Sequence, residues 1–232
     1  MDLAEWKAHA NSLLSPAERV KDELRTVIAD LKERYPRWLE FNDARWAWFT
    51  GAKKVIQTSQ LCYIYVRDQL TDPEWWREKA AEFDSIPGHI AEYDVFVRYG
   101  FSNMLFTITE ETLRSIVRAI DPAACADATA GFQSIYTHLL KVVGKEQHLP
   151  LFDFHRLIRN TVHTNGVFRP RNGRNASILL AGKKYDFVVG NKLDFLSFAV
   201  LLDLVSQYKA AILDIIETDT IARIHHVERF QW

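Results

Sequence analysis

Apolar residues recur at helical spacing along most of the chain, and long segments contain neither glycine nor proline. Over residues 15–35 they follow Ser15 and Pro16, which predict a helix N-terminus, and Pro36 predicts its end. Further helices are predicted over residues 52–70, from Asp72-Pro73 to 83, from Ser102 or Asn103 to Asp121-Pro122, over 122–144 with Gly144 at the end, over 151–164 and over 192–217. The fold class is therefore all-α, an antiparallel helical bundle whose most apolar helix, 192–217, lies at its centre.

One segment departs from the helical spacing. Residues 177–189 predict two short strands that turn at Gly182-Lys183, a small β-hairpin. We assign the hairpin to a helical bundle over residues 91–232, preceded by an N-terminal helical region, 1–90, of unknown role. Because no flexible linker separates the two parts, one continuous domain is the alternative.

Composition places the chain among folded globular proteins, with 48% hydrophobic and 25% charged residues in 232. The formal net charge of −1 excludes a polycation, so any nucleic-acid surface must be local. Cys62 and Cys125 have no metal-ligand spacing, and we expect two buried thiols in a reducing cytosol. The first residues do not resemble a signal peptide and no apolar run reaches about 20 residues, so we expect a cytoplasmic protein without a membrane partner.

The predicted helix 151–164 has an unusual polar face. At about 100° per residue, Arg156, Arg159, Asn160 and His163 fall within an arc of about 100°, opposite a row of apolar residues. A solvated face normally mixes lysine with glutamate, whereas this one gathers two arginines, an asparagine and a histidine.

The surrounding segment is strongly basic. Residues 151–184 contain seven basic side chains and one acid, Asp153, a net charge of +6 within a chain of net charge −1. The basic residues are Arg156, Arg159, Arg169, Arg171, Arg174, Lys183 and Lys184. Arginine binds two phosphate oxygens at once, which favours a phosphate site. The structural alternative is that Arg156 and Arg159 pair with acids on neighbouring helices, while His163 and Asn165 cap the helix end.

Other chemical motifs are not supported. The chain contains neither a phosphate-binding P-loop nor a glycine-rich dinucleotide motif, and no nucleophile-elbow serine. His225 and His226 are adjacent, so on a helix they point apart and do not predict a shared metal ion. We therefore expect no metal and no cofactor.

The stretch "LIRNTVHTNG" resembles the motif of the HEPN superfamily (higher eukaryotes and prokaryotes nucleotide-binding domain). The resemblance rests on an arginine, Arg159, followed by a polar residue, Asn160, with a histidine, His163, one turn later. It extends over residues 95–217, with the two preceding helices and the long one that follows, and does not explain the first ninety residues. It implies an all-α bundle that forms homodimers.

Many members of that superfamily are metal-independent ribonucleases in which the motifs of two protomers meet in a basic cleft. The resemblance implies that His163 is general base or acid at the ribose 2′-hydroxyl, that Arg159 stabilises charge on the scissile phosphate, and that Asn160 orients one of them. We expect Arg156, Asn165, Arg169, Arg171 and Arg174 to contact phosphate or RNA. A ribonuclease of a toxin or defence system would also have an antitoxin-type protein as partner.

The spacing departs from the family pattern. Four to six residues usually separate the arginine from the histidine, but only three lie between Arg159 and His163; Arg156 has six but is followed by a leucine. Residues four apart still share a helix face, so the spacing permits joint action on one phosphate. The leading hypothesis is an RNA- or nucleotide-phosphate-binding protein with metal-independent endoribonuclease activity. The alternatives are a non-catalytic dimeric interaction module and a small-nucleotide sensor with a closed pocket.

Overall fold

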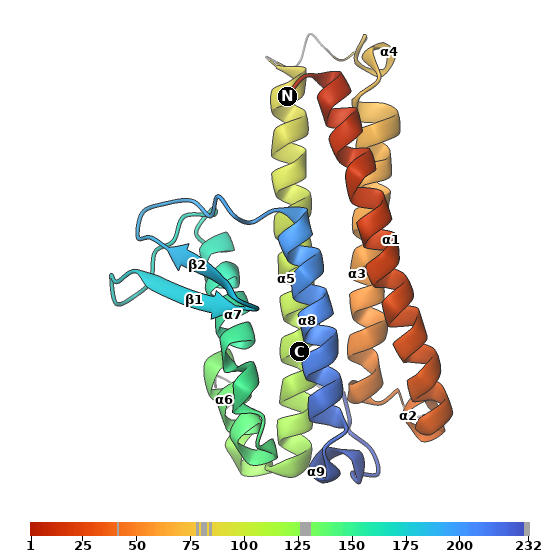
Figure 1. Ribbon diagram of the computed structural model, residues 1–232, viewed down its shortest axis with the longest axis vertical. Coiled ribbons are helices and arrows are strands. Elements are labelled where there is room, and N and C mark those ends of the chain that lie inside the picture. The colour runs from red at the N-terminus through yellow and green to blue at the C-terminus, as the bar shows by residue number, and fades with distance from the viewer. Residues whose placement is uncertain (41, 78, 80–82, 84, 126–130, 230–232) are drawn as a thin grey trace.

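Two long helices set the length of the molecule in the computed structural model (Figure 1). Helix α1, Leu3–Arg34, and helix α5, Ile86–Ile120, span about 48 and 53 Å at a rise of 1.5 Å per residue. The structure describes residues 1–40, 42–77, 79, 83, 85–125 and 131–229. The other α-helices and the two strands are α2 (Pro36–Glu40), α3 (Ala44–Tyr65), α4 (Pro73–Trp76), α6 (Phe132–Val143), α7 (Leu149–Val162), β1 (Ala176–Leu180), β2 (Lys183–Phe187), α8 (Phe198–Ile216) and α9 (Asp219–Ala222). Short 3-10 turns cover Pro122–Cys125 and Glu146–His148.

The arrangement confirms the predicted all-α bundle with one hairpin. Helices α1 and α3 lie on one side of α5 and α8, and α6 and α7 lie on the other, with the hairpin packed against α7 (Figure 1). Helix α8 is at the centre, as predicted, because its buried side chains face both halves. Helix α5 runs through residues 90 and 91, so both parts of the chain contribute to it. None of the helices in the described ranges has the length and apolar character that a membrane span requires.

The first helix begins thirteen residues earlier than predicted, at Leu3 instead of Pro16. Asp2 accepts a hydrogen bond from the backbone of Glu5 and Glu5 accepts one from the backbone of Asp2, which forms a capping box. Pro16, expected in the first turn, lies inside α1. The buried stripe Trp6–Ala10–Leu13–Ala17 continues across it, so core packing offsets the backbone hydrogen bond that proline cannot donate.

Other predicted boundaries shift for similar reasons. Helix α3 begins at Ala44 instead of residue 52, capped by Asp43, and a π-helical turn over Val66–Leu70 follows it. Helix α5 begins at Ile86, capped by Ser85, rather than at residue 102. The predicted ends at Asp121 and Gly144 are confirmed. Asp72 and Pro73 do start a helix, but α4 is only four residues long, and much of its predicted extension lies outside the described residues.

The hairpin turns one position earlier than predicted, at Ala181-Gly182. Both residues have positive φ, 49° and 78°, as a two-residue hairpin turn of this kind requires. Tyr185 and Phe187 alternate with exposed residues along β2 and pack their rings against Phe154 of α7. The hairpin therefore covers α7 and closes the core on that side.

Helix α3 is joined to the C-terminal segment by a buried ion pair. The Arg45 guanidinium donates to both carboxylate oxygens of Asp43, at 2.8 and 2.6 Å, and to the Ile221 carbonyl oxygen at 2.8 Å. Asp43 also accepts from the backbone of Val227 at 2.9 Å, and Arg45 stacks on Trp38. Both charged side chains are buried. The pair therefore connects α2, α3, α9 and the segment after α9.

We expect Arg45→Ala to lower the free energy of unfolding by about 3–5 kcal/mol, because it leaves the Asp43 carboxylate buried without its cation. Urea denaturation at neutral pH measures the change. Arg37→Ala, which removes an exposed arginine from α2, is the matched control and should change stability by less than about 0.5 kcal/mol. A loss below about 1 kcal/mol for Arg45→Ala would show that the pair does not hold the two segments together.

Candidate functional site

The inner face of α7 packs against α6 and α8 through one phenylalanine and against the hairpin through another. Phe152 stacks on Tyr136 of α6 and contacts Tyr208 of α8 edge-on. Phe154, two residues after Phe152, packs against the rings of Tyr185 and Phe187 in the hairpin. Because both phenylalanines are buried, α7 has little freedom to rotate about its axis.

A buried histidine adds directional contacts to this packing. His155 Nε2 lies 3.3 Å from the Ser102 carbonyl oxygen of α5, and Nδ1 lies 3.0 Å from the hydroxyl of Tyr208. A carbonyl oxygen can only accept, so Nε2 donates to it and Nδ1 accepts from the tyrosine. Complete burial lowers the pKa of His155 to about 4, so the ring is neutral at pH 7. His155 is therefore a structural residue that ties α7 to α5 and α8.

The opposite side of α7 borders a cleft of about 830 Å³. Its walls are α7, Phe106 of α5, residues 131–133 at the start of α6, and the segment from Phe168 to Ile178 that leads into the hairpin. Seven of the eight predicted site residues line it: Arg156, Arg159, Asn160, His163, Arg169, Arg171 and Arg174. Asp153 is the one carboxylate among the described lining residues. The fold therefore gathers the basic residues of two separate segments around one cavity.

Arg156 is the arginine whose charge is partly neutralised. Its Nη2 lies 3.0 Å from Asp153 Oδ1, one turn earlier on α7, and its Nε donates to the Tyr136 hydroxyl at 3.1 Å. Tyr136 donates to the same Asp153 oxygen at 2.5 Å. Burial, followed by the hydrogen bond to Asp153, raises the pKa of Tyr136, so the hydroxyl stays protonated. The three side chains hold Arg156 in a fixed position at the cleft wall.

Arg159 has no carboxylate within ion-pair distance in the part of the chain that the structure describes. Its guanidinium lies over the Phe106 ring, with Cζ 5.0 Å from the ring centre, and Nη1 donates to Asn160 Oδ1 at 3.3 Å. These contacts orient the guanidinium without neutralising it. The structural alternative for Arg159, burial against an acid on another helix, does not describe this geometry.

His163 follows the last residue of α7 and its side chain is exposed to solvent. Partial burial, followed by the positive charge of Arg159, lowers the pKa of His163 below its usual value. The neutral imidazole predominates at pH 7, and in this form it can accept a proton.

Asn165 is the predicted site residue that does not line the cleft. It has a positive φ of 57°, and Gly166 follows with a φ of 78° and donates to the Thr161 carbonyl oxygen at 2.9 Å. A Cβ atom on Gly166 would lie only 1.9 Å from the hydroxyl oxygen of Tyr99 on α5. Asn165 and Gly166 therefore reverse the chain at the end of α7 and bring it back over α5.

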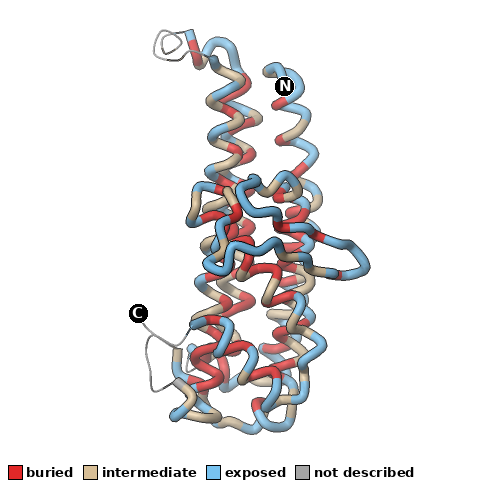
Figure 2. The backbone as a smooth tube through the Cα atoms, turned by 90° about the vertical axis from the view of Figure 1, so that its left-hand side faces the viewer, coloured by how far each residue is buried: buried red, intermediate tan, exposed pale blue. Residues whose placement is uncertain are grey.

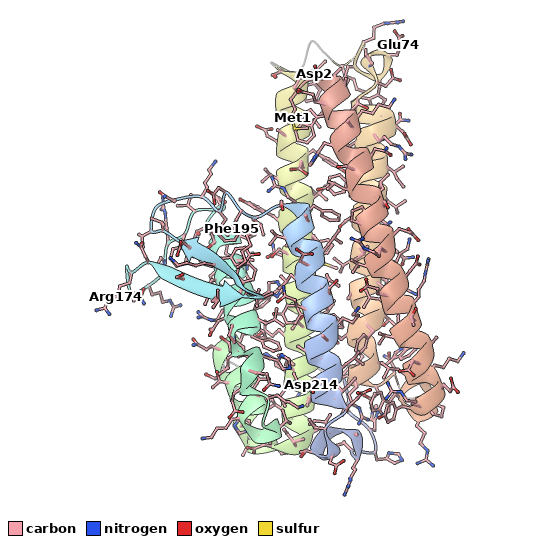
Figure 3. All side chains as sticks on the ribbon, in the orientation of Figure 1. Met1, Asp2, Glu74, Arg174, Phe195 and Asp214 are labelled. Atoms are coloured by element: carbon pink, nitrogen blue, oxygen red, sulfur yellow. The ribbon has the colours of Figure 1, made fainter. Side chains whose placement is uncertain are left out.

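The arginine-bearing segment after α7 is anchored at both ends. Phe168 is buried against Phe187, and the Asn175 side chain accepts from the backbone of Val189 at 2.9 Å. Between these anchors Arg169, Arg171 and Arg174 are exposed, and Arg174 projects from the outer end (Figure 3). On this side of the molecule the segment and hairpin form a largely exposed outer layer (Figure 2). The three arginines are presented to solvent on a fixed base.

Two residues that orient the cleft arginines had no signal in the sequence. Phe106 and Tyr136 lie on α5 and α6, and only the packing of those helices brings them to Arg159 and Arg156. Lys183 and Lys184, counted in the basic segment, belong to β2 and do not line the cleft; Lys184 pairs with Asp186 at 3.0 Å. Glu110 and Glu111 of α5 are further carboxylates near the middle of the chain, but neither lines the cleft. Glu110 pairs with Arg114, and Glu111 pairs with Arg229.

The described residues contain no group of three or more histidine, cysteine, aspartate or glutamate side chains placed to hold a metal ion. Comparison with known proteins gives no relatives: no family model matches the chain, and no curated protein or solved structure is significantly similar to it. The chemistry of the cleft therefore has to be argued from its own residues.

We expect Arg159→Ala to raise the pKa of His163 part of the way toward its usual value. The substitution removes the repelling charge, while desolvation, the larger cause, remains. Titration of the His163 ring by NMR measures the change. Arg174→Ala, which removes an equal charge from the outer end of the cleft, should shift it less. A lowered or unchanged pKa in Arg159→Ala would contradict the coupling.

Proposed function

We propose that the cleft binds the phosphate groups of RNA and that the protein is a HEPN-like, metal-independent endoribonuclease. The observation that carries the proposal is the pair Arg159 and His163, which lie one turn apart at the C-terminal end of α7. Both residues line the cleft, and Arg159 has no carboxylate partner among the described residues. Three further arginines on the following segment extend the positive surface. An anionic polymer fits this distribution better than one small phosphate, because the arginines that line the cleft come from two segments, α7 and residues 168–178.

RNA carries its own nucleophile, so proton transfer and charge stabilisation suffice for cleavage. Neutral His163 takes the proton of a ribose 2′-hydroxyl, and the resulting oxygen attacks the adjacent phosphorus. The bond from phosphorus to the 5′-oxygen breaks, which leaves a 2′,3′-cyclic phosphate and a 5′-hydroxyl. Arg159 binds the non-bridging oxygens as negative charge develops on them, and Asn160 orients Arg159 through its side-chain oxygen.

The leaving 5′-oxygen needs a proton from a second acid. His163 is the residue of the described cleft that titrates nearest neutral pH, so we assign the acid to His163 of a second protomer in a homodimer, as the resemblance implies. Asp153 and Tyr136 hold Arg156 in place, and Arg156 binds a neighbouring phosphate. The rival from another class, a non-catalytic dimeric interaction module, uses the same residues without RNA and predicts no loss of RNA binding on their removal.

Binding is tested with a fluorescent single-stranded RNA whose 2′-O-methyl riboses prevent cleavage. We expect Arg159→Ala to weaken binding about tenfold and to reduce the salt slope of log K by about 0.7, the value for one lost phosphate contact on a single strand. Arg19→Ala, an exposed arginine of α1 distant from the cleft, is the control and should bind as the wild type does. Equal binding by all three proteins would place the RNA elsewhere.

Cleavage is tested on unmodified RNA in excess EDTA. We expect the wild type to cleave and His163→Ala to lose at least about 100-fold in rate, the usual contribution of a general acid or base. His9→Ala on α1 controls for the loss of any histidine, and circular dichroism checks that each variant is folded. Equal rates in wild type and His163→Ala would indicate a contaminating nuclease or another site. No cleavage of varied RNAs, with binding intact, would leave an RNA-binding protein without nuclease activity.

A further inference from the structure

A second cavity lies between α3 and α5, away from the α7 cleft. Its volume is about 380 Å³, within the range of small-molecule sites. It is lined from Ala47 to Cys62 on α3, which is about 22 Å of helix at 1.5 Å per residue. A volume of this size over that length describes a long, narrow groove.

The groove is apolar along most of its length and its apolar side chains are open to solvent. Phe96 is 71% exposed and Met104 57%, whereas core residues of their type are buried. Val55, Phe101 and Ile108 form its floor, and Gly100 leaves it open, since a Cβ there would meet nothing within 4 Å. An exposed, concave apolar surface of this kind is costly in water and marks a binding site.

One end of the groove is polar. Glu111 and Arg229 lie there and neutralise each other, with Arg229 Nε 2.8 Å from Glu111 Oε1. Lys54 lies seven residues after Ala47 on α3, about 10 Å along the helix at 1.5 Å per residue. It is exposed and has no ion-pair partner among the residues that the structure describes. The groove therefore offers one uncompensated positive charge next to an extended apolar channel.

We propose that this groove binds an amphiphilic carboxylate, with the carboxylate at Lys54 and the alkyl chain extending over Met104 toward Phe96 and Cys62. An extended alkyl chain suits a long, narrow groove, and one carboxylate matches Lys54, which has no ion-pair partner among the described residues. The site is independent of the RNA cleft, although both use opposite sides of α5.

The probes are decanoate and decan-1-ol, which share a chain and differ in charge, measured by isothermal titration calorimetry. We expect both to bind the wild type. Lys54→Gln should weaken decanoate about two- to fivefold, the range of an exposed ion pair, and leave decan-1-ol unchanged. Lys53→Gln, the neighbouring lysine that does not line the groove, is the control and should change neither.

Gly100→Leu places a side chain in the groove from a position where a Cβ meets nothing within 4 Å, and it removes a helical glycine, so the variant should remain folded. We expect it to lose more than tenfold in affinity for both probes. Cys62 gives a local readout: decanoate should slow the addition of N-ethylmaleimide to Cys62 in the wild type, followed by mass spectrometry.

Three outcomes would overturn the proposal. Unchanged affinities in Gly100→Leu and Lys54→Gln would place the probes elsewhere. A wild-type dimer that Gly100→Leu converts to monomers in sedimentation would identify a second copy as the occupant. Tighter probe binding after removal of residues 230–232, which follow Arg229 in the chain, would identify those residues as the occupant.

Discussion

The orientation of α7 about its own axis is the constraint on which the candidate site depends. His155 fixes it from within, because its two ring nitrogens contact Tyr208 on α8 and the Ser102 carbonyl on α5. Phe152 and Phe154 pack on either side of it. With that face buried, Arg156, Asn160 and His163 face outward, and Arg159, one turn after His155, lies at the edge of the buried face, over Phe106. The cleft lies along the outer side of α7, and the packing of the inner side fixes the orientation of the helix.

The rest of the molecule supports this arrangement through α5. The buried Arg45–Asp43 pair ties α3 to the C-terminal segment, and α3 packs along α5. Helix α5 then serves both candidate sites, with Phe106 beneath Arg159 on one side and Met104 in the apolar groove on the other. Ligands at the two sites would therefore contact one rigid element from opposite faces.

Sequence reasoning predicted features that depend on local chemistry. The amphipathic α7, the hairpin and the ends at Asp121 and Gly144 follow from periodicity and from residues with special backbone preferences. It was wrong where tertiary packing decides. Helix α1 continues through Pro16 because a buried stripe crosses it, and Cys62, expected to be buried, is partly exposed in the groove. The side chain of Cys125, the other predicted buried thiol, lies outside the described residues.

The same division holds for the site. Helical spacing brought Arg156, Arg159, Asn160 and His163 to one face, and seven of the eight predicted residues line the cleft. Asn165 does not line the cleft, because it is a turn residue at the point where the chain reverses direction after α7, next to Tyr99. Phe106 and Tyr136 were missed, since nothing local links residues from other helices to α7.

NMR on the isotope-labelled protein shows most directly whether RNA lies in the α7 cleft, as we propose. A 2′-O-methyl RNA is titrated in while the Nε–H signals of arginine and the ring signals of histidine are followed. We expect Arg159, Arg174 and His163 to shift together and saturably, while Arg19 and His9 on α1 do not. Saturable binding that leaves Arg159 and His163 unchanged, or no binding at low salt, would contradict RNA binding in this cleft.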